Sequence, residues 1–156
     1  MSISTTSRTI YPARVLVVGD EPPLRRLLET VFETAGIEVV EAASVADAQQ
    51  RLGVAARDLG AVVLDLVRAE AQGLELLNAI RRDPKLAWLP VIFVAGRLGE
   101  QDRLRALRAG ADIFVAKPFS VRGLQQLVLR LVRDGRPILP ELHARRPVQR
   151  PRSRSA

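Results

Sequence analysis

Five short, almost wholly apolar runs alternate with segments in which apolar residues recur at helical spacing. The runs predict strands at about 14–19, 37–42, 60–66, 90–95 and 112–116. The run at 60–66 is apolar at nearly every position, which is typical of a central parallel strand that is covered on both faces. The pattern therefore favours a parallel sheet.

Helices are predicted between these strands, and residues with special backbone preferences mark their ends. Pro22 and Pro23 suit the first turn of the first helix, and Gly36 suits its C-terminal cap. Ser44 and Ser120 are suitable N-caps for the second and fifth helices. The predicted helices are 22–35, 45–52, 73–83, 99–109 and 120–134. The residues that trace one apolar face of the first helix are Leu24, Leu27, Leu28, Val31, Phe32 and Ala35.

Strands and helices that alternate along one chain indicate an α/β protein built from βα repeats. We therefore predict a (βα)5 doubly wound parallel sheet, with helices on both faces and right-handed crossovers. The predicted domain spans residues 14–135. Residues 1–13 are expected to form a flexible leader. Residues 136–156 are rich in proline and arginine and are expected to form a disordered tail.

The composition narrows the class of protein. The chain has 156 residues, which fits one domain with tails, and its core must be aliphatic because only 4% of the residues are aromatic. The absence of cysteine excludes disulfides and thiolate metal sites and fits a reducing compartment. No apolar run approaches the roughly 18 residues that a membrane helix needs, and the polar N-terminus does not resemble a secretory signal. We expect a cytoplasmic protein without a membrane segment.

The net charge of +7 is unevenly placed, because six arginines face only two acids between residues 134 and 156. Such a tail attracts acidic partners or nucleic acid by Coulomb forces. The simpler interpretation is a solvated tail that keeps the protein soluble. The tail has no aromatic residues for base stacking and no helical period for entering a groove. Nucleic-acid binding is therefore the weaker alternative.

Charged residues stand at the C-terminal ends of three predicted strands. Asp20 follows the first strand, Asp65 ends the third, and Lys117 follows the fifth. Ligands bind at this edge of an open parallel α/β sheet, although the strand order decides whether the three tips meet. If they meet, the two carboxylates repel each other unless a cation lies between them, and Mg²⁺ suits oxygen ligands. A carboxylate oxygen of Asp65 could then accept a phosphoryl group, which Lys117 would stabilise.

Two other interpretations remain for Asp65, a structural one and an enzymatic one. A single aspartate at a strand end commonly caps the following turn or helix. An aspartyl phosphatase or mutase also uses a strand-end aspartate with Mg²⁺, but such enzymes usually carry a second aspartate two residues later. Here Val67 occupies that position. An independent enzyme is therefore the weaker interpretation, and we expect a protein that is not an enzyme.

Several stretches resemble one known family when they are taken together. Residues 15–22 look like its first strand and acidic pair, residues 63–66 look like its phosphoacceptor strand, and residues 117–119 look like the stretch around its signature lysine. From about residue 14 to 133, the chain resembles the receiver domain of bacterial two-component response regulators. The resemblance implies a flavodoxin-like fold with strand order 2-1-3-4-5 and a cis bond before Pro118.

The resemblance also implies functional roles. Asp65 would accept a phosphoryl group from a histidine kinase or phosphotransfer protein, and Lys117 would stabilise that group. Mg²⁺ would be held by the side chains of Asp20 and Asp65 and by the backbone carbonyl of Val67. The surface of the fourth helix, fifth strand and fifth helix would meet an unknown downstream protein or form a homodimer. The polar residues after the domain are too few for an output domain, so a single-domain regulator is expected.

The chain departs from the family pattern at informative positions. Gly19 stands where the family usually has an acid that acts on the metal through water, so metal affinity is expected to be weaker. Ala95 replaces the Ser or Thr whose hydroxyl bonds the phosphoryl group, which weakens the coupling to an active conformer. Phe114 matches the switching aromatic but has no hydroxyl. The chain is therefore either a phosphoryl-accepting receiver with altered coupling or a phosphorylation-independent docking module.

Overall fold

The structure, a computed structural model, describes residues 14–67, 70–96 and 100–137. A five-stranded sheet lies at its centre, with strand order β2-β1-β3-β4-β5 and all neighbouring strands parallel. This order confirms the one that the resemblance implied. The strands are β1 (Arg14–Gly19), β2 (Glu38–Ala42), β3 (Ala61–Asp65), β4 (Val91–Ala95) and β5 (Ile113–Ala116).

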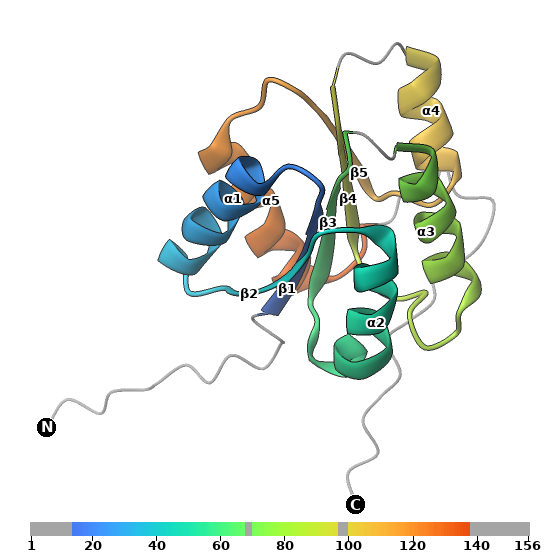
Figure 1. Ribbon diagram of the computed structural model, residues 1–156, viewed down its shortest axis with the longest axis horizontal. Coiled ribbons are helices and arrows are strands. Elements are labelled where there is room, and N and C mark those ends of the chain that lie inside the picture. The colour runs from blue at the N-terminus through green and yellow to red at the C-terminus, as the bar shows by residue number, and fades with distance from the viewer. Residues whose placement is uncertain (1–13, 68–69, 97–99, 138–156) are drawn as a thin grey trace, which may run out of the picture.

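Helices cover both faces of the sheet, which confirms the doubly wound arrangement. Figure 1 shows α1 and α5 on one side of the sheet and α2, α3 and α4 on the other. None of the helices in the described ranges has the length and apolar character needed to cross a bilayer. The helices are α1 (Pro22–Thr34), α2 (Val45–Ala55), α3 (Glu70–Arg82), α4 (Glu100–Arg108), α5 (Val121–Asp134) and the short 3₁₀ helix η1 (Ala56–Asp58).

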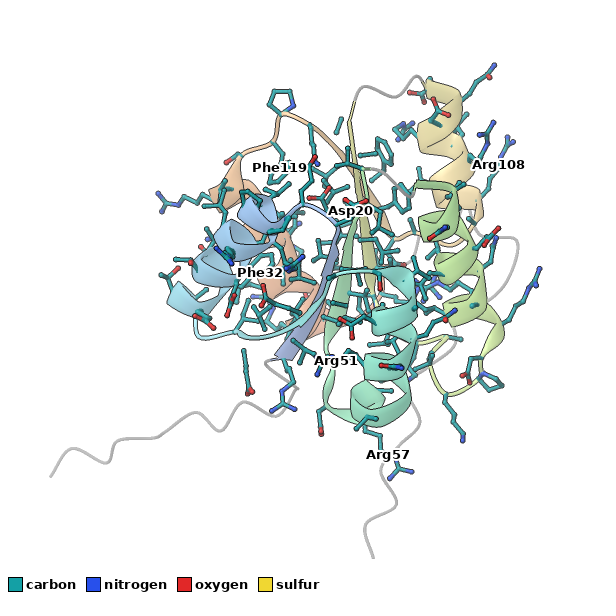
Figure 2. All side chains as sticks on the ribbon, viewed as in Figure 1. Asp20, Phe32, Arg51, Arg57, Arg108 and Phe119 are labelled. Atoms are coloured by element: carbon teal, nitrogen blue, oxygen red, sulfur yellow. The ribbon has the colours of Figure 1, made fainter. Side chains whose placement is uncertain are left out.

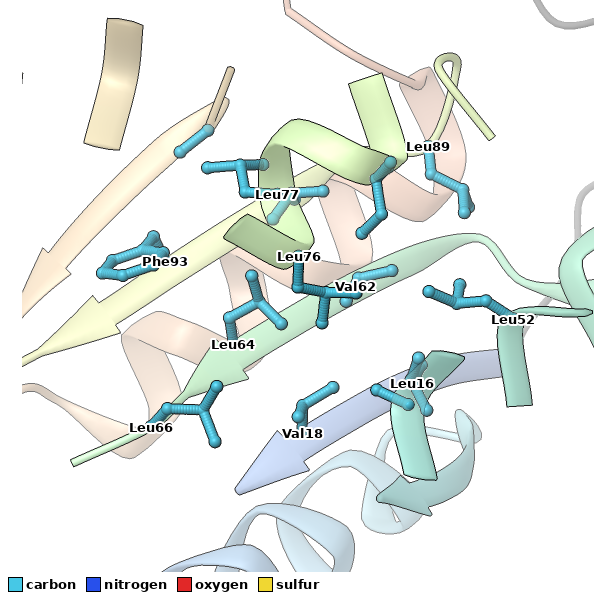
Figure 3. Close-up of a cluster of buried hydrophobic side chains, with 14 of the residues drawn as sticks. Leu16, Val18, Leu52, Val62, Leu64, Leu66, Leu76, Leu77, Leu89 and Phe93 are labelled. Carbon is cyan, nitrogen blue, oxygen red and sulfur yellow. The ribbon is translucent and has the colours of Figure 1, made fainter. Parts of the chain in front are cut away.

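The sheet builds one hydrophobic core on each face, because alternate strand residues point to opposite sides. Leu16 and Val18 of β1 belong to the core beneath α2 and α3, which Figure 3 shows in close-up. Val15 and Val17 belong to the core beneath α1 and α5. Every residue of β3 is buried, as predicted for a central strand. The rigid centre of the sheet therefore fixes where its strand ends lie.

Several local signals act as the sequence predicts. The Ser44 hydroxyl accepts a hydrogen bond from the Asp47 amide at 3.1 Å and caps α2. The Ser120 hydroxyl accepts one from the Gly123 amide at 3.0 Å and caps α5. Gly36 follows α1 with φ of 79°, a backbone conformation that favours glycine. The peptide bond between Lys117 and Pro118 is cis, as the resemblance implied.

Three predictions about the helices were wrong. The second helix ends at Ala55 and not at residue 52. The third helix begins at Glu70 and not at Gly73, so Gly73 lies inside α3. A Cβ atom there would come within 3.2 Å of Leu66 Cδ1 and 3.5 Å of Phe93 Cε2, so this glycine permits close packing of the helix on the sheet. Leu27 was expected on the inner face of α1 but is 45% exposed. Helical spacing alone overestimated the width of the buried face of α1.

A buried charge network lies at the N-terminal edge of the sheet, opposite the predicted site. The Asp112 carboxylate accepts hydrogen bonds from Arg81 Nη2, Arg136 Nε and the Val91 amide, each at 2.8 Å. The Asp112 side chain is fully buried, and both arginine side chains are nearly so. Arg136 was assigned to the tail by the sequence analysis, yet its side chain packs against the domain. The network therefore joins α3, β4, β5 and the end of α5.

Replacing Asp112→Ala should lower the free energy of unfolding by about 3–5 kcal/mol, because two buried guanidinium groups would lose their shared carboxylate. Urea unfolding followed by far-UV circular dichroism would measure the loss. Asp134→Ala is the matched control, because Asp134 is exposed and forms its ion pair with the exposed side chain of its neighbour Arg133. Its expected cost is within about 0.5 kcal/mol. Equal stability of the two variants would contradict the structural role of the network.

Candidate functional site

The C-terminal edge of the sheet brings the three predicted site residues toward one place. Asp65 is the last residue of β3, and Gly19 is its partner on β1, so Asp20 begins just beside it. Lys117 follows β5, and its amide donates a hydrogen bond to the Ala95 carbonyl at 2.8 Å. Its side chain therefore starts beyond the end of β4, the strand that separates β3 from β5.

Asp65 and Lys117 form an ion pair at this edge. Lys117 Nζ lies 2.7 Å from Asp65 Oδ1, and the side chains are 22% and 4% exposed. Sequence separation between the two residues is large, so the strand order alone makes this contact possible. The sequence alone could not decide whether Asp65 and Lys117 meet. The strand order of the fold brings them together.

Burial raises the pKa of Asp65 above its ordinary value of 3.8, because the buried site disfavours the charged carboxylate. Lys117 opposes this shift through its positive charge. The charges of Glu21 and Asp20 raise the pKa further, which shows that three acids lie within electrostatic reach of one another. The site therefore holds more negative charge than its one lysine balances.

Asp20 joins the end of β1 to the loop after β3. Its Oδ1 accepts a hydrogen bond from the Val67 amide at 3.0 Å, although 47 residues separate the two in sequence. Val67 itself is 47% exposed. Figure 2 shows Asp20 at the same end of the molecule as Phe119, which lies just after β5, and opposite Arg57. This contact fixes the Asp20 carboxylate beside the Asp65 strand end.

Arg25 lies at the same edge and was missed by the sequence analysis. Its Nη1 donates a hydrogen bond to the Gly19 carbonyl at 2.7 Å. Its Nε lies 3.4 Å from Glu41 Oε1, and its side chain is only 16% exposed. A hint was available in the sequence, since an arginine in the first turn of a helix is placed against the unfavourable end of the helix dipole. The sequence does not show that the partners of Arg25 are the Gly19 carbonyl and Glu41.

Two of the positions that depart from the family pattern, Ala95 and Phe114, make apolar contacts. Ala95 ends β4 and is buried, with 4% of its surface exposed. Phe114 packs against the core on the α3 and α4 side, and its ring stacks on Phe93 with centroids 6.3 Å apart. A methyl group and two phenyl rings offer no hydrogen-bond donor to an oxygen-rich ligand. Polar contacts at this edge therefore come from other residues.

The donor set suits a hard divalent cation only in part. Within the described ranges no cluster of three or more acidic, histidine or cysteine side chains has the arrangement of a metal site. Burial is the main reason that the pKa of Asp65 is raised, and the charge of Asp20 adds to the shift; a divalent cation between the two carboxylates would favour their ionised forms. The two carboxylates thus fit Mg²⁺ by charge and by ligand type, but they are fewer than the three or more acidic side chains of a site built only from protein ligands.

A parallel sheet in this order, with helices on both faces, defines a flavodoxin-like α/β fold, and a buried aspartate is paired with a lysine at its C-terminal edge. The response regulator receiver domain matches residues 15–129. The chain belongs to this family. It is therefore a receiver domain of two-component signalling and not a conventional enzyme.

Curated relatives agree with this assignment. The chain is 33% identical over 128 residues to the phosphate regulon transcriptional regulatory protein PhoB of Klebsiella pneumoniae, covering 82% of the chain and 55% of that protein. It is 37% identical over 115 residues to the KDP operon transcriptional regulatory protein KdpE of Escherichia coli, covering 71% of the chain and 47% of that protein. The chain thus spans about half the length of the curated relatives it matches.

Solved structures show the same fold. The Francisella response regulator 1452 receiver domain superposes with a TM-score of 0.68 at 25% identity, covering 76% of this chain and 95% of that one. The chemotaxis response regulator CheY4 of Vibrio cholerae gives a TM-score of 0.68 at 22% identity, covering 76% and 97% of the two chains. The second likeness concerns the fold alone.

The raised pKa of Asp65 has a direct consequence for stability. Between 3.8 and the raised pKa, the folded protein holds a proton that the unfolded chain has released, so stability falls as the pH rises through this window. Asp65→Asn should therefore raise the free energy of unfolding at neutral pH, by about 1 kcal/mol. The gain should shrink as the pH falls toward 3.8.

Urea unfolding at a series of pH values would measure this difference. Asp58→Asn is the matched control, because Asp58 is an exposed acid whose side chain lies 3.8 Å from Arg14. Its effect should stay within about 0.5 kcal/mol at every pH. An Asp65→Asn protein that is less stable than the wild type at neutral pH would contradict the strained state of the carboxylate.

Proposed function

We propose that this receiver accepts a phosphoryl group on Asp65 from the phosphohistidine of a histidine kinase or phosphotransfer protein. The observation that supports this proposal is the 2.7 Å ion pair between Lys117 and the buried Asp65 carboxylate at the ligand-binding edge of the sheet. An Asp65 oxygen forms a bond to phosphorus while the bond between phosphorus and the histidine nitrogen breaks. The electron pair stays on that nitrogen, and the product on Asp65 is an acyl phosphate.

Lys117 has a role before and after this transfer. Before transfer it favours the ionised carboxylate, because its charge lowers a pKa that burial raises. During transfer its ammonium group balances negative charge on the phosphoryl oxygens. After transfer the site gains negative charge, and Lys117 pairs with the phosphoryl group instead of the bare carboxylate. One cation thus supports both states of Asp65.

Mg²⁺ is the cofactor that these residues would hold. The ligands we propose are the carboxylates of Asp20 and Asp65 and the backbone carbonyl of Val67. Bound Mg²⁺ would supply positive charge next to the phosphoryl oxygens. The hydrogen bond from the Val67 amide to Asp20 keeps the first ligand beside the loop that carries the third. Gly19 contributes no carboxylate, so we expect weaker affinity than a site with a second acid at that position.

A second candidate function is that of a docking module whose partner binding does not depend on phosphorylation. The apolar surroundings of Ala95 and Phe114 favour it, because neither residue offers a hydroxyl to a phosphoryl group. Under this reading the domain keeps its fold and its binding surface but transmits no phosphorylation state. The two functions differ in one measurable property, which is whether Asp65 takes up phosphate.

The partners we propose follow from family membership. The phosphoryl donor is a histidine kinase or phosphotransfer protein, and signalling proceeds in the cytoplasm through a downstream protein. The surface of α4, β5 and α5 is our proposed site for that protein or for a homodimer. It carries exposed arginines on both helices, among them Arg108 and Arg130. Signalling by protein contact is favoured over nucleic-acid binding through the basic residues 138–156, which lie outside the described ranges.

Phosphate uptake is the direct test of the first function. Acetyl phosphate with Mg²⁺ should add one phosphoryl group to the wild type, and beryllofluoride should give one bound ¹⁹F NMR signal. Asp65→Asn should abolish both, and Asp20→Asn should weaken both by about tenfold because a metal ligand is lost. Asp58→Asn, an exposed acid that precedes β3 at the opposite edge of the sheet, is the control that should behave as the wild type. No response at millimolar reagent would favour the docking module.

The role of position 95 can be tested separately. Ala95→Ser should enlarge the set of amide resonances in β4, α4 and β5 that shift on beryllofluoride addition, because the new hydroxyl bonds only the loaded state. Ala95→Cys has similar volume and a much weaker donor, so it should leave the wild-type set unchanged. Two-dimensional ¹H–¹⁵N NMR would compare the three proteins. Identical responses from all of them would show that the missing hydroxyl does not limit the response.

A further inference from the structure

Arg25 holds the peptide group that leads directly into Asp20. Its Nη1 donates to the Gly19 carbonyl at 2.7 Å, and that carbonyl belongs to the same planar unit as the Asp20 amide. The contact is partly buried, so water competes weakly for the carbonyl. The orientation of this plane sets the position of the Asp20 Cα atom, from which its carboxylate extends. Arg25 therefore constrains Asp20 from the backbone side.

Arg25 is itself held from two directions. Its amide donates to the Glu21 carbonyl at 3.1 Å, which anchors it in the first turn of α1. Its Nε forms an ion pair at 3.4 Å with Glu41 Oε1, a buried oxygen at the end of β2 that has no hydrogen-bond partner among the described residues. The guanidinium group is thus fixed between β2 and the tip of β1.

A continuous chain of contacts results. Glu41 holds Arg25, Arg25 holds the Gly19 carbonyl, and Asp20 follows Gly19 and accepts from the Val67 amide at 3.0 Å. The chain runs from β2 through α1 and β1 to the loop after β3. It ends on two of the three residues that we propose as metal ligands.

We propose that Arg25 is a positioning residue for the magnesium site, acting through the Gly19 carbonyl on the Asp20 carboxylate. This inference rests on the proposed function, since it assigns Asp20 to the metal. Arg25 does not touch the ligand. Its cation compensates Glu41. Arg25 Cβ lies 3.5 Å from where a Gly19 Cβ would lie, which is an ordinary van der Waals separation, so the two residues are packed side by side.

Positioning and simple charge repulsion predict opposite results for Arg25→Gln. A guanidinium group that acted only by its charge would repel Mg²⁺, so its removal would tighten metal binding. A guanidinium group that holds Asp20 in place supports metal binding, so its removal should weaken the affinity for Mg²⁺ by about tenfold. Isothermal titration of Mg²⁺ into the full chain would decide the sign. Unchanged or tighter binding by Arg25→Gln would overturn the proposal.

A readout without metal separates this inference from the proposed function. Hydrogen exchange of the Val67 amide reports its bond to Asp20 in the metal-free protein. Exchange should become several-fold faster in Arg25→Gln and stay unchanged in Arg26→Gln, a matched loss of an exposed arginine from the neighbouring position on α1. If the wild type binds no Mg²⁺, the metal assignment fails, and Val67 exchange still decides whether Arg25 positions Asp20.

Glu41→Gln tests the same chain if Arg25→Gln does not fold. It leaves the arginine in place and weakens the contact that orients it. Val67 exchange and the Mg²⁺ dissociation constant should both shift in the same direction as in Arg25→Gln, by a smaller factor. Wild-type values for both quantities in Glu41→Gln would contradict the proposed chain from β2 to the metal ligands.

Discussion

One constraint governs the site. A carboxylate at the end of the most buried strand must stay ionised, although burial favours its neutral form. Asp65 is only 3% exposed, and burial alone would push it toward its neutral form. Lys117 offsets this cost from beyond the end of β4, at 2.7 Å. The strand order makes the contact possible, because it sets β5 two places from β3. The fold and the chemistry of the site therefore meet in a single ion pair.

The two buried aspartates among the described residues show how one sheet serves two purposes. Asp112, at the N-terminal edge, accepts hydrogen bonds from two arginines and one amide, so its charge is satisfied. Asp65, at the opposite edge, meets one ammonium group and two neighbouring acids that raise its pKa. The first arrangement holds the molecule together. The second leaves a carboxylate whose charged form is disfavoured, a property that is common at functional sites.

The end of β1, which carries Asp20, differs in charge from the pattern of the receiver family. Gly19 supplies no carboxylate, and the guanidinium group of Arg25 is fixed against its carbonyl. The site therefore has one acid fewer and one arginine close by, with Glu41 balancing that cation. In the metal site that we propose, Asp20 and Asp65 supply the two carboxylates, so the orientation of Asp20 matters more. Ala95 and Phe114 add only apolar surface at this edge.

The sequence by itself determined the strands, most helices, the caps at Ser44 and Ser120, and the candidates Asp20, Asp65 and Lys117, because these follow from local periodicity and strand ends. Resemblance supplied the strand order, which periodicity cannot. Only the tertiary structure decided the roles of Arg25, Arg81 and Arg136, since a long flexible side chain finds its partners through space. It also decided that α3 begins at Glu70 and that Leu27 is exposed, because packing against neighbouring elements overrides the signals of one segment.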